Sequence, residues 1–292
     1  IAPLPRESGQ RYQPPAVAEP EPRARAFGRT LPEAWRVGSF SALAAGQSGE
    51  MPDYDMTANA PEPAESTEST ESASVVPGRD IFGFPRGARA GTCLHAIFER
   101  ADFTQRDRSR LEELANRTLA AHGLDAATWT PVVADLVERV LDTPLDASGL
   151  RLATVAPERR LCEMEFYYPL ANLRAEGLRR VLERHGYAVG PFRDTIDKLE
   201  FAPLRGYMKG YIDLVFEADG RFYLADYKSN WLGGEPAAYR RPRLEEAMAR
   251  EAYVLQYLIY SVALHRYLRQ RVLDYGYERH FGGVFYLFLR GM

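Results

Sequence analysis

Two aspartates and a lysine stand in one stretch, residues 210–228, whose pattern predicts a β-hairpin. Both arms are rich in Val, Ile, Leu, Phe and Tyr, and Asp219-Gly220 between them is typical of a two-residue turn with positive φ at both central residues. That turn places Asp213 opposite Asp226, and opposite side chains on one face lie about 4.5–5.5 Å apart at Cβ. Lys228 is predicted to share the face of Asp226, because side chains alternate along a strand.

This arrangement costs stability unless it binds something. Two facing carboxylates repel each other, whereas a divalent cation between them converts the repulsion into affinity. The hairpin therefore predicts a metal-dependent hydrolase. The alternative is a surface salt bridge on an exposed edge strand, since Asp226-Tyr-Lys228 taken alone is a weak motif. The second acid, placed opposite by the hairpin and inside two apolar arms, favours the catalytic interpretation.

Composition sets broad limits. The chain has 292 residues, of which 46% are hydrophobic and 26% charged, as is ordinary for a globular protein. Two cysteines, Cys93 and Cys162, are too few for a disulfide framework or a Cys-rich metal site, which favours a reducing, cytoplasmic setting. No apolar run approaches the ~20 residues of a membrane span. The net charge of −3 is uneven, with −4 in residues 1–88 and +1 in the rest, so charge alone does not exclude DNA as a ligand.

Three parts are expected along the chain. Residues 1–43 contain an apolar island, Trp35 to Leu43, that ends in a Ser-x-Ser helix start. Residues 44–78 are rich in Gly, Ser, Thr, Glu and Pro and are predicted to form a flexible acidic linker. Residues 79–292 form the candidate catalytic domain. Both ends of the sequence suggest a fragment of a longer protein, with its C-terminus truncated.

The hydrophobic periodicity of the catalytic domain predicts a mixed central sheet flanked by helices, α/β in class. Helices are expected near residues 91–100, 107–122, 127–141, 171–185 and 244–270, and strands near 159–168 and 283–289, in addition to the hairpin.

Four short motifs occur in one order along the chain. They are Gly91-x-x-x-His95, Gly210-Tyr-Ile-Asp213, Asp226-Tyr-Lys228 and Gln256-Tyr-Leu-Ile-Tyr260. With them, residues 24–292 resemble the nuclease domain of RecB subunits of exodeoxyribonuclease V, within the PD-(D/E)XK nuclease superfamily. The stretches 227–233 and 264–290 resemble RecB domains in particular. The resemblance implies a restriction-endonuclease-like core, and it assigns residues 1–43 to the end of a helicase part and the start of a tether.

The resemblance also implies roles for the acidic motifs. Asp213, Asp226 and the backbone carbonyl of Tyr227 would bind Mg²⁺, with one or two ions per site, and Ca²⁺ would occupy the site without supporting cleavage. His95 would be a metal ligand or a contact to the site. The alternative is a histidine with a purely structural role on a helix. Lys228 would position the attacking water or stabilise charge on phosphorus.

Gln256 and Tyr260 are assigned by the same motif as contacts to the DNA backbone or the attacking water. They lie four residues apart and so share a helix face. The other tyrosines of this helix, Tyr253, Tyr257 and Tyr267, are expected in the core.

A further metal-facing acid is expected on the strand near 159–168. Relatives carry a glutamate there that points toward the metal, and Glu163 is ranked above Glu165, which competes for the role. Either residue could instead lie on the surface.

The function implied is Mg²⁺-dependent cleavage of DNA in a bacterial, cytoplasmic helicase–nuclease that repairs double-strand breaks. RecC-like and RecD-like subunits and upstream helicase domains of the same chain would be its partners. The sequence holds no phosphate-binding Gly-x-x-x-x-Gly-Lys-Ser/Thr loop, and two cysteines cannot bind the iron–sulfur cluster of some relatives. Two rival interpretations are an inactive nuclease fold used as a scaffold or DNA-binding module, and a stand-alone repair nuclease.

Overall fold

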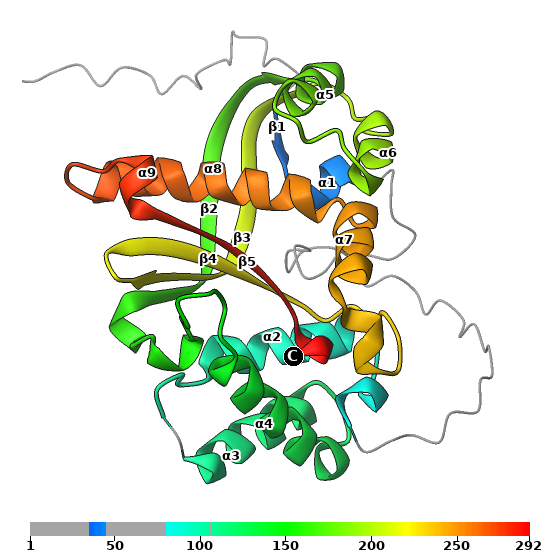
Figure 1. Ribbon diagram of the computed structural model, residues 1–292, viewed down its shortest axis with the longest axis vertical. Helices are drawn as coiled ribbons and strands as arrows, with labels where there is room; N and C mark the ends of the chain where they lie inside the picture. The colour runs from blue at the N-terminus through cyan, green and yellow to red at the C-terminus, as the bar shows by residue number, and fades with distance from the viewer. Residues whose placement is uncertain (1–34, 45–79, 106) are drawn as a thin grey trace, which may run out of the picture. The chain divides into compact units, whose positions relative to one another are not determined.

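The computed structural model describes residues 35–44, 80–105 and 107–292 (Figure 1). The predicted linker falls almost wholly outside these residues. The strands are β1 Trp35–Gly38, β2 Arg160–Leu173, β3 Leu204–Ala218, β4 Arg221–Lys228 and β5 Phe281–Phe288. The helices are α1 Phe40–Ala44, α2 Ala88–Arg100, α3 Arg108–Ala121, α4 Ala126–Asp142, α5 Ala175–Arg184, α6 Pro191–Asp197, α7 Arg241–Arg250, α8 Tyr253–Arg271 and α9 Tyr277–His280.

The five strands form one mixed sheet organised around the long strand β3. Strand β2 pairs antiparallel with β3 from Leu204 to Phe216, along nearly its whole length. The other edge of β3 is shared, because β1 pairs parallel with residues 205–208 and β4 pairs antiparallel with residues 214–218. Strand β5 then adds parallel to β4. The mixed sheet flanked by helices that the periodicity predicted is confirmed.

The hairpin has the predicted register. Asp219 and Gly220 take φ of 50° and 74°, and Ala218 pairs with Arg221. The pair farthest from the turn is Leu214 with Ala225, so the ladder ends one step before Asp213 and Asp226. The two aspartates therefore lie where β4 separates from β3 rather than within the ladder.

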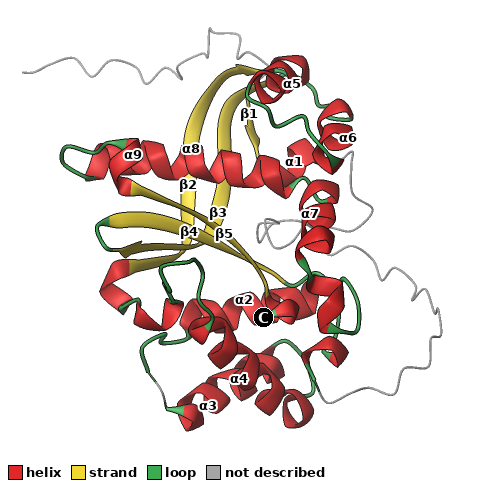
Figure 2. Cartoon of the chain, in the orientation of Figure 1, coloured by secondary structure: helices red, strands yellow, loops and turns green. Residues whose placement is uncertain are grey.

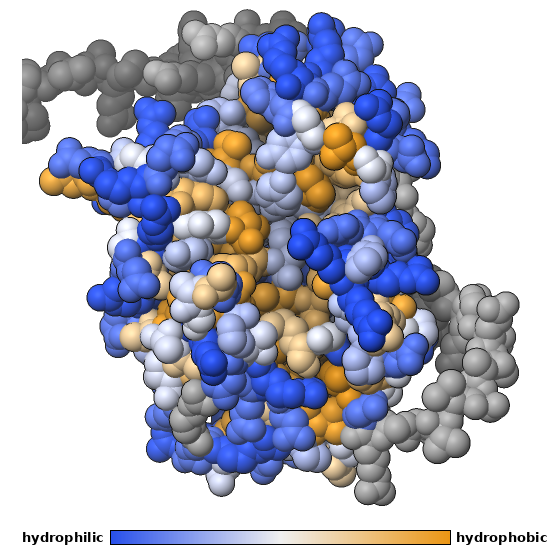
Figure 3. Space-filling model, in the orientation of Figure 1, coloured by the Kyte–Doolittle hydropathy of each residue, from blue (hydrophilic) through white to orange (hydrophobic). Residues whose placement is uncertain are grey.

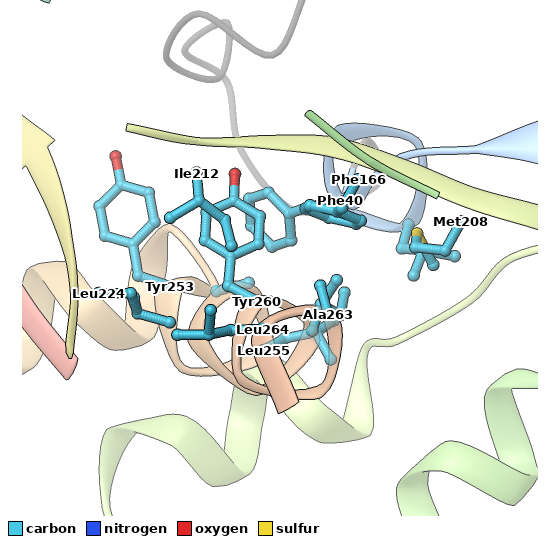
Figure 4. Packing of buried hydrophobic residues seen from close by; sticks show 14 of the residues in the cluster. Phe40, Phe166, Met208, Ile212, Leu224, Tyr253, Leu255, Tyr260, Ala263 and Leu264 are labelled. Carbon is cyan, nitrogen blue, oxygen red and sulfur yellow. The ribbon is translucent and has the colours of Figure 1, made fainter. Parts of the chain in front are cut away.

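Each face of the sheet has its own apolar core. Helix α8 crosses β2 and β3 on one face (Figure 2), where Phe166, Met208, Ile212, Tyr260 and Leu264 pack together (Figure 4). Helices α2, α3 and α4 group near the hairpin end of the same strands, and their core includes residues of β3 and β4. In the space-filling view (Figure 3), apolar residues gather in the middle of the visible face, with hydrophilic residues around them. The site lies between these two cores.

The segment before the linker belongs to this sheet, which the sequence analysis did not anticipate. Strand β1 pairs with β3, and Phe40 and Leu43 of α1 are buried in the core under α8. Gly206 takes φ +139°, and a Cβ there would collide with the backbone carbonyl of Arg36, so glycine permits the close approach of β1. Residues 35–44 thus belong to the same sheet and core as the residues that follow the linker.

Two predicted boundaries are wrong. The helix expected over 244–270 is two helices, α7 and α8, separated at Ala252, which takes φ +55°. Strand β2 continues to Leu173, so the helix expected over 171–185 begins only at Ala175. No Gly or Pro stands at either boundary to predict it. Among the described residues, no helix combines the length and apolar character needed to cross a membrane.

Arg290 links the last described residues of the chain to the segment that leads into α2. Its side chain is buried, and its guanidinium donates to the carbonyls of Ile81, Phe84, Pro85 and Ser229 at 2.6–3.1 Å. Burial lowers the pKa of Arg290 to about 10. These bonds hold the segment leading into α2 against the residue that follows Lys228.

Replacing Arg290 by alanine should therefore destabilise the fold by about 3–5 kcal/mol, because four carbonyls lose a charged donor in the interior. Denaturant unfolding measures this. Arg290→Lys should recover only part of the loss, since an ammonium lacks the planar fork of a guanidinium. Arg241→Ala, at a side chain that is 90% exposed, is the matched control. A loss below about 1 kcal/mol in Arg290→Ala would contradict this role.

Candidate active site

The site begins at the point where β4 leaves β3. Here the backbone N–H of Tyr227 donates to Asp213 Oδ2 at 2.7 Å, in place of a strand-to-strand bond. The N–H and C=O of one strand residue point to the same edge. The carbonyl of Tyr227 therefore also faces the gap that opens between the strands, as expected of the predicted ligand. Both Asp213 and Asp226 are buried.

Helix α2 brings His95 to this gap. Its Nδ1 lies 3.5 Å from Asp213 Oδ2, and its imidazole is buried. The apolar face of α2 fixes this position, since Leu94, Ile97 and Phe98 are fully buried and Phe98 stacks on Tyr227 with ring centres 4.5 Å apart. The predicted histidine is thus beside the acid of the hairpin.

Glu163 completes the cluster from β2. The pairs Cys162–Leu214 and Met164–Ile212 on either side place it opposite Asp213. Ligand atoms of His95, Glu163 and Asp213 all lie within 4.8 Å of one another. Glu163 also takes φ +49°, a left-handed conformation that costs a non-glycine residue about 1–2 kcal/mol. Strain of this kind at a polar residue points to function.

Glu165 is engaged elsewhere. Its carboxylate accepts a hydrogen bond from Tyr211 Oη at 2.6 Å and lies 3.0 Å from Lys209 Nζ on an exposed part of the sheet. The geometry therefore favours Glu163 as the acid that faces a metal, in line with the order of preference drawn from the sequence.

Lys228 and Asp226 form a buried ion pair on the α8 side of the gap. The distance from Lys228 Nζ to Asp226 Oδ2 is 2.7 Å, and the ammonium lies 3.9 Å from the centre of the Tyr253 ring. Sequence reasoning assigned Tyr253 only to the core. Its signal was its spacing, because Tyr253 lies three residues before Gln256 and so on the same helix face.

The surroundings of the two aspartates shift their pKa values in opposite directions. Burial raises the pKa of Asp226 to about 8, although the charge of Lys228 opposes the shift, so the contact with Lys228 becomes an ion pair as the pH rises through that value. Burial also acts to raise the pKa of Asp213, but the charge and hydrogen bond of His95, with Lys228 and the Tyr227 N–H, lower it below its usual value. Two neighbouring carboxyl groups with diverging pKa values are typical of catalytic sites.

This difference predicts a pH effect on the metal-free protein. Between the unfolded pKa of Asp226, ~3.9, and the folded value, the folded state binds more protons, so its stability falls as pH rises. Asp226→Asn removes that titration. Between about pH 5 and pH 8, the free energy of unfolding of the variant should therefore gain on that of the wild type, by up to about 1.4 kcal/mol per pH unit. Urea unfolding in EDTA measures the difference, and parallel pH profiles would contradict it.

Gln256 and Tyr260 are buried under the sheet. Gln256 Nε2 donates to Tyr260 Oη at 3.1 Å, and Tyr286 Oη donates to Gln256 Oε1 at 2.9 Å. Tyr286 is paired with Asp226 in the β4–β5 ladder, so this network adjoins the ion pair. Their role toward substrate stays a prediction. Of the tyrosines expected in the core, Tyr253 is buried and Tyr257 half-buried, but Tyr267 is exposed, which contradicts its assignment.

The donors fit a hard divalent cation. Two carboxylates, a backbone carbonyl directed into the gap and one imidazole offer mainly oxygen ligands, as Mg²⁺ and Mn²⁺ prefer. Cys162 and Cys93 take no part in this cluster. The arrangement can therefore hold a cation next to a lysine ammonium, the combination expected for hydrolysis of a phosphodiester.

Comparison with known proteins agrees with this geometry. Residues 76–291 match the PD-(D/E)XK nuclease superfamily. The chain belongs to this superfamily. It is similar to the RecBCD enzyme subunit RecB of Escherichia coli strain K12, with 40% identity over 287 residues, covering 97% of this chain and 23% of that protein. The same subunit of Haemophilus influenzae is 39% identical over 215 residues (73% and 17%), and that of Mycolicibacterium smegmatis 34% over 308 residues (96% and 28%).

The chain thus spans about a quarter of the length of these curated relatives. The resemblance to RecB nuclease domains read from the motifs is confirmed, and so is the superfamily fold. Both findings support nuclease function for this chain, without specifying the metal or the type of nuclease.

Proposed function

We propose that this chain is the Mg²⁺-dependent deoxyribonuclease part of a RecBCD-type helicase–nuclease, of the exodeoxyribonuclease V type. The observation that carries the proposal is the gathering of His95, Glu163 and Asp213 within 4.8 Å, next to the buried Asp226–Lys228 pair. Such a cluster costs stability in the absence of a ligand. A cation and a phosphodiester supply the charges that offset this cost.

The metal would be held by Asp213, Glu163 and the Tyr227 carbonyl, with Asp226 and His95 as the remaining candidates. When bound, a divalent cation polarises the scissile phosphate and lowers the pKa of a bound water. Mg²⁺ demands near-octahedral oxygen coordination, whereas Ca²⁺ takes more ligands in a looser shell. Occupation by Ca²⁺ without cleavage is therefore expected.

Side chains of this chain would position the attacking water and the DNA backbone. Lys228 Nζ is held between Asp226 Oδ2 and the Tyr253 ring, and from this position it would donate to an attacking water or a phosphate oxygen. Asp213 stays ionised because His95 and the Tyr227 N–H stabilise its charge. Gln256 and Tyr260 would contact the DNA backbone or the attacking water through the network that adjoins Asp226.

The role of the whole protein is proposed from the relatives. The protein would act in double-strand break repair and recombination in the bacterial cytoplasm. The relatives' name, RecBCD enzyme subunit RecB, supports RecC-like and RecD-like subunits as its partners. Helicase domains of the same protein would precede this segment, which holds no nucleotide-binding loop of its own.

The rival proposal is an inactive fold that serves as a scaffold or a DNA-binding module. The buried Asp226–Lys228 pair and the left-handed Glu163 argue against it, because both are costly and a scaffold has no use for either.

The test is the incubation of the chain with end-labelled linear single-stranded DNA in Mg²⁺, in Ca²⁺ and in EDTA. Shortened products are expected in Mg²⁺ alone. A folded chain that binds the DNA in all three conditions but never cleaves it, even with the partner subunits added, would support the scaffold instead.

A further inference from the structure

One face of the sheet carries exposed aromatic rings and a cation. We call it the aromatic face and define it by Trp35 of β1, Tyr207, Lys209 and Tyr211 of β3, and Tyr167 of β2. Trp35 is 53%, Tyr167 54% and Tyr207 41% exposed, values that are high for such large side chains.

The backbone explains why these side chains share a face. Residues 204–210 of β3 alternate between buried and exposed, with the buried ones under α8. The exposed Tyr207 and the half-buried Lys209 and Tyr211 point to the side that α8 does not cover. Strand β1 brings Trp35 beside it, with its ring centre 5.7 Å from that of Tyr207 in an edge contact.

A hydrogen-bonded group lies at the centre of the aromatic face. Lys209 Nζ lies 5.2 Å from the Tyr167 ring centre and 5.3 Å from that of Tyr211. Glu165 accepts hydrogen bonds from both tyrosine hydroxyls and pairs with Lys209, so the two rings are held in fixed positions. Arg205, exposed and paired with Trp35 in the ladder, adds a second cation at the far end. The face therefore offers rigid rings together with two cations, of which Lys209 is paired with Glu165.

The aromatic face is continuous with the active site. Tyr211 pairs with Glu165, and each lies two residues from a site acid on its own strand, Tyr211 before Asp213 and Glu165 after Glu163. At ~3.3 Å per residue, the ring nearest the site is about 7 Å along the strand from Asp213, and the position of Arg205 lies about 20 Å further. A ligand that crosses the face along β3 thus arrives at the acids.

We propose that the aromatic face binds single-stranded DNA and leads the strand into the site. Bases of a single strand expose their faces and stack on aromatic side chains, whereas bases of a duplex do not. Phosphates would pair with Lys209 and Arg205. The inference rests on the proposed nuclease function, since it deepens the substrate of that site. It selects a single strand over a protein partner because cations alternate with the rings and the face ends at catalytic carboxylates.

The test measures the affinity of the 292-residue chain for a labelled oligothymidylate by fluorescence anisotropy in EDTA, where no cleavage occurs. The double variant Trp35→Ala with Tyr207→Ala should weaken binding roughly tenfold or more. Tyr207→Phe should keep wild-type affinity, since stacking needs the ring and not the hydroxyl. Lys209→Gln should reduce the salt dependence of binding by about one phosphate contact.

Tyr277→Ala is the matched control, because Tyr277 is an equally exposed tyrosine on α9, away from this face. Thermal melting verifies the fold, and the single variant Trp35→Ala, at an exposed edge position, replaces the double variant if that one unfolds. Unchanged affinity in Trp35→Ala and Lys209→Gln, or no binding of the oligonucleotide by the wild type, would overturn the inference.

The same variants separate the two proposals. If the wild type cleaves DNA in Mg²⁺ and the aromatic variants bind and cleave as it does, the proposed role of the aromatic face is wrong and the proposed nuclease function is supported. If the wild type never cleaves but the aromatic variants bind DNA more weakly than it does, DNA binding by the aromatic face is supported and the proposed nuclease function is wrong.

Discussion

Asp226→Ala is expected to lower Mg²⁺-dependent DNA cleavage by on the order of 10³-fold or more, because the chain loses a proposed metal ligand and the partner that orients Lys228. Asp226 is buried and contributes no surface to DNA. Binding of DNA in EDTA should therefore stay within a few-fold of wild type while cleavage is lost. Initial rates on end-labelled DNA, with the affinity measured separately, give both quantities.

The control for this variant is Glu113→Ala, which removes an exposed acid of α3 that is remote from the site. It should leave the cleavage rate unchanged. A rate for Asp226→Ala within tenfold of wild type would show that the acid is not part of the catalytic machinery, and the ion pair would then be structural.

Lys228→Met should produce the second large loss, about 10²–10³-fold in cleavage rate at saturating DNA, as expected when a preorganised donor is removed from the transition state. Methionine keeps much of the length of the side chain but carries no proton. Because Lys228 is 1% exposed, bulk solvent cannot substitute for its ammonium. The loss should appear in the maximal rate and not in the affinity for DNA.

Arginine should not restore this activity. The ammonium occupies a closed space between Asp226 and the Tyr253 ring, and the larger, planar guanidinium does not fit it. Lys198→Met, at an exposed lysine after α6, is the matched control and should cleave like wild type. Rescue by Lys228→Arg would mean that only a positive charge is needed there, not a directed proton.

Local signals predicted the hairpin and its acids well. Asp219-Gly220 fixed the turn, and a fixed turn determines which residues pair until the strands separate. The face shared by Asp226 and Lys228 followed from strand alternation alone, and the ion pair between them agrees with it. These features depend on residues close together in the chain, where spacing carries most of the information.

Features that depend on distant contacts escaped prediction. Strand β1 is four residues long and pairs with a strand some 170 residues later, so periodicity could not reveal it. The left-handed conformation of Glu163 occurs within the part of β2 that pairs with β3, and no local residue signal predicts it. Arg290 binds carbonyls of two segments that are distant in the sequence, and no local spacing predicts those contacts.

The most direct measurement is anomalous diffraction from crystals of the chain soaked in Mn²⁺. A peak is expected at the gap between β3 and β4, from an ion coordinated by Asp213, Glu163 and the carbonyl of Tyr227, and it should be lost in Asp213→Ala. A crystal with Mn²⁺ bound elsewhere, or with no peak at this gap at saturating Mn²⁺, would contradict the metal site and the nuclease mechanism built on it.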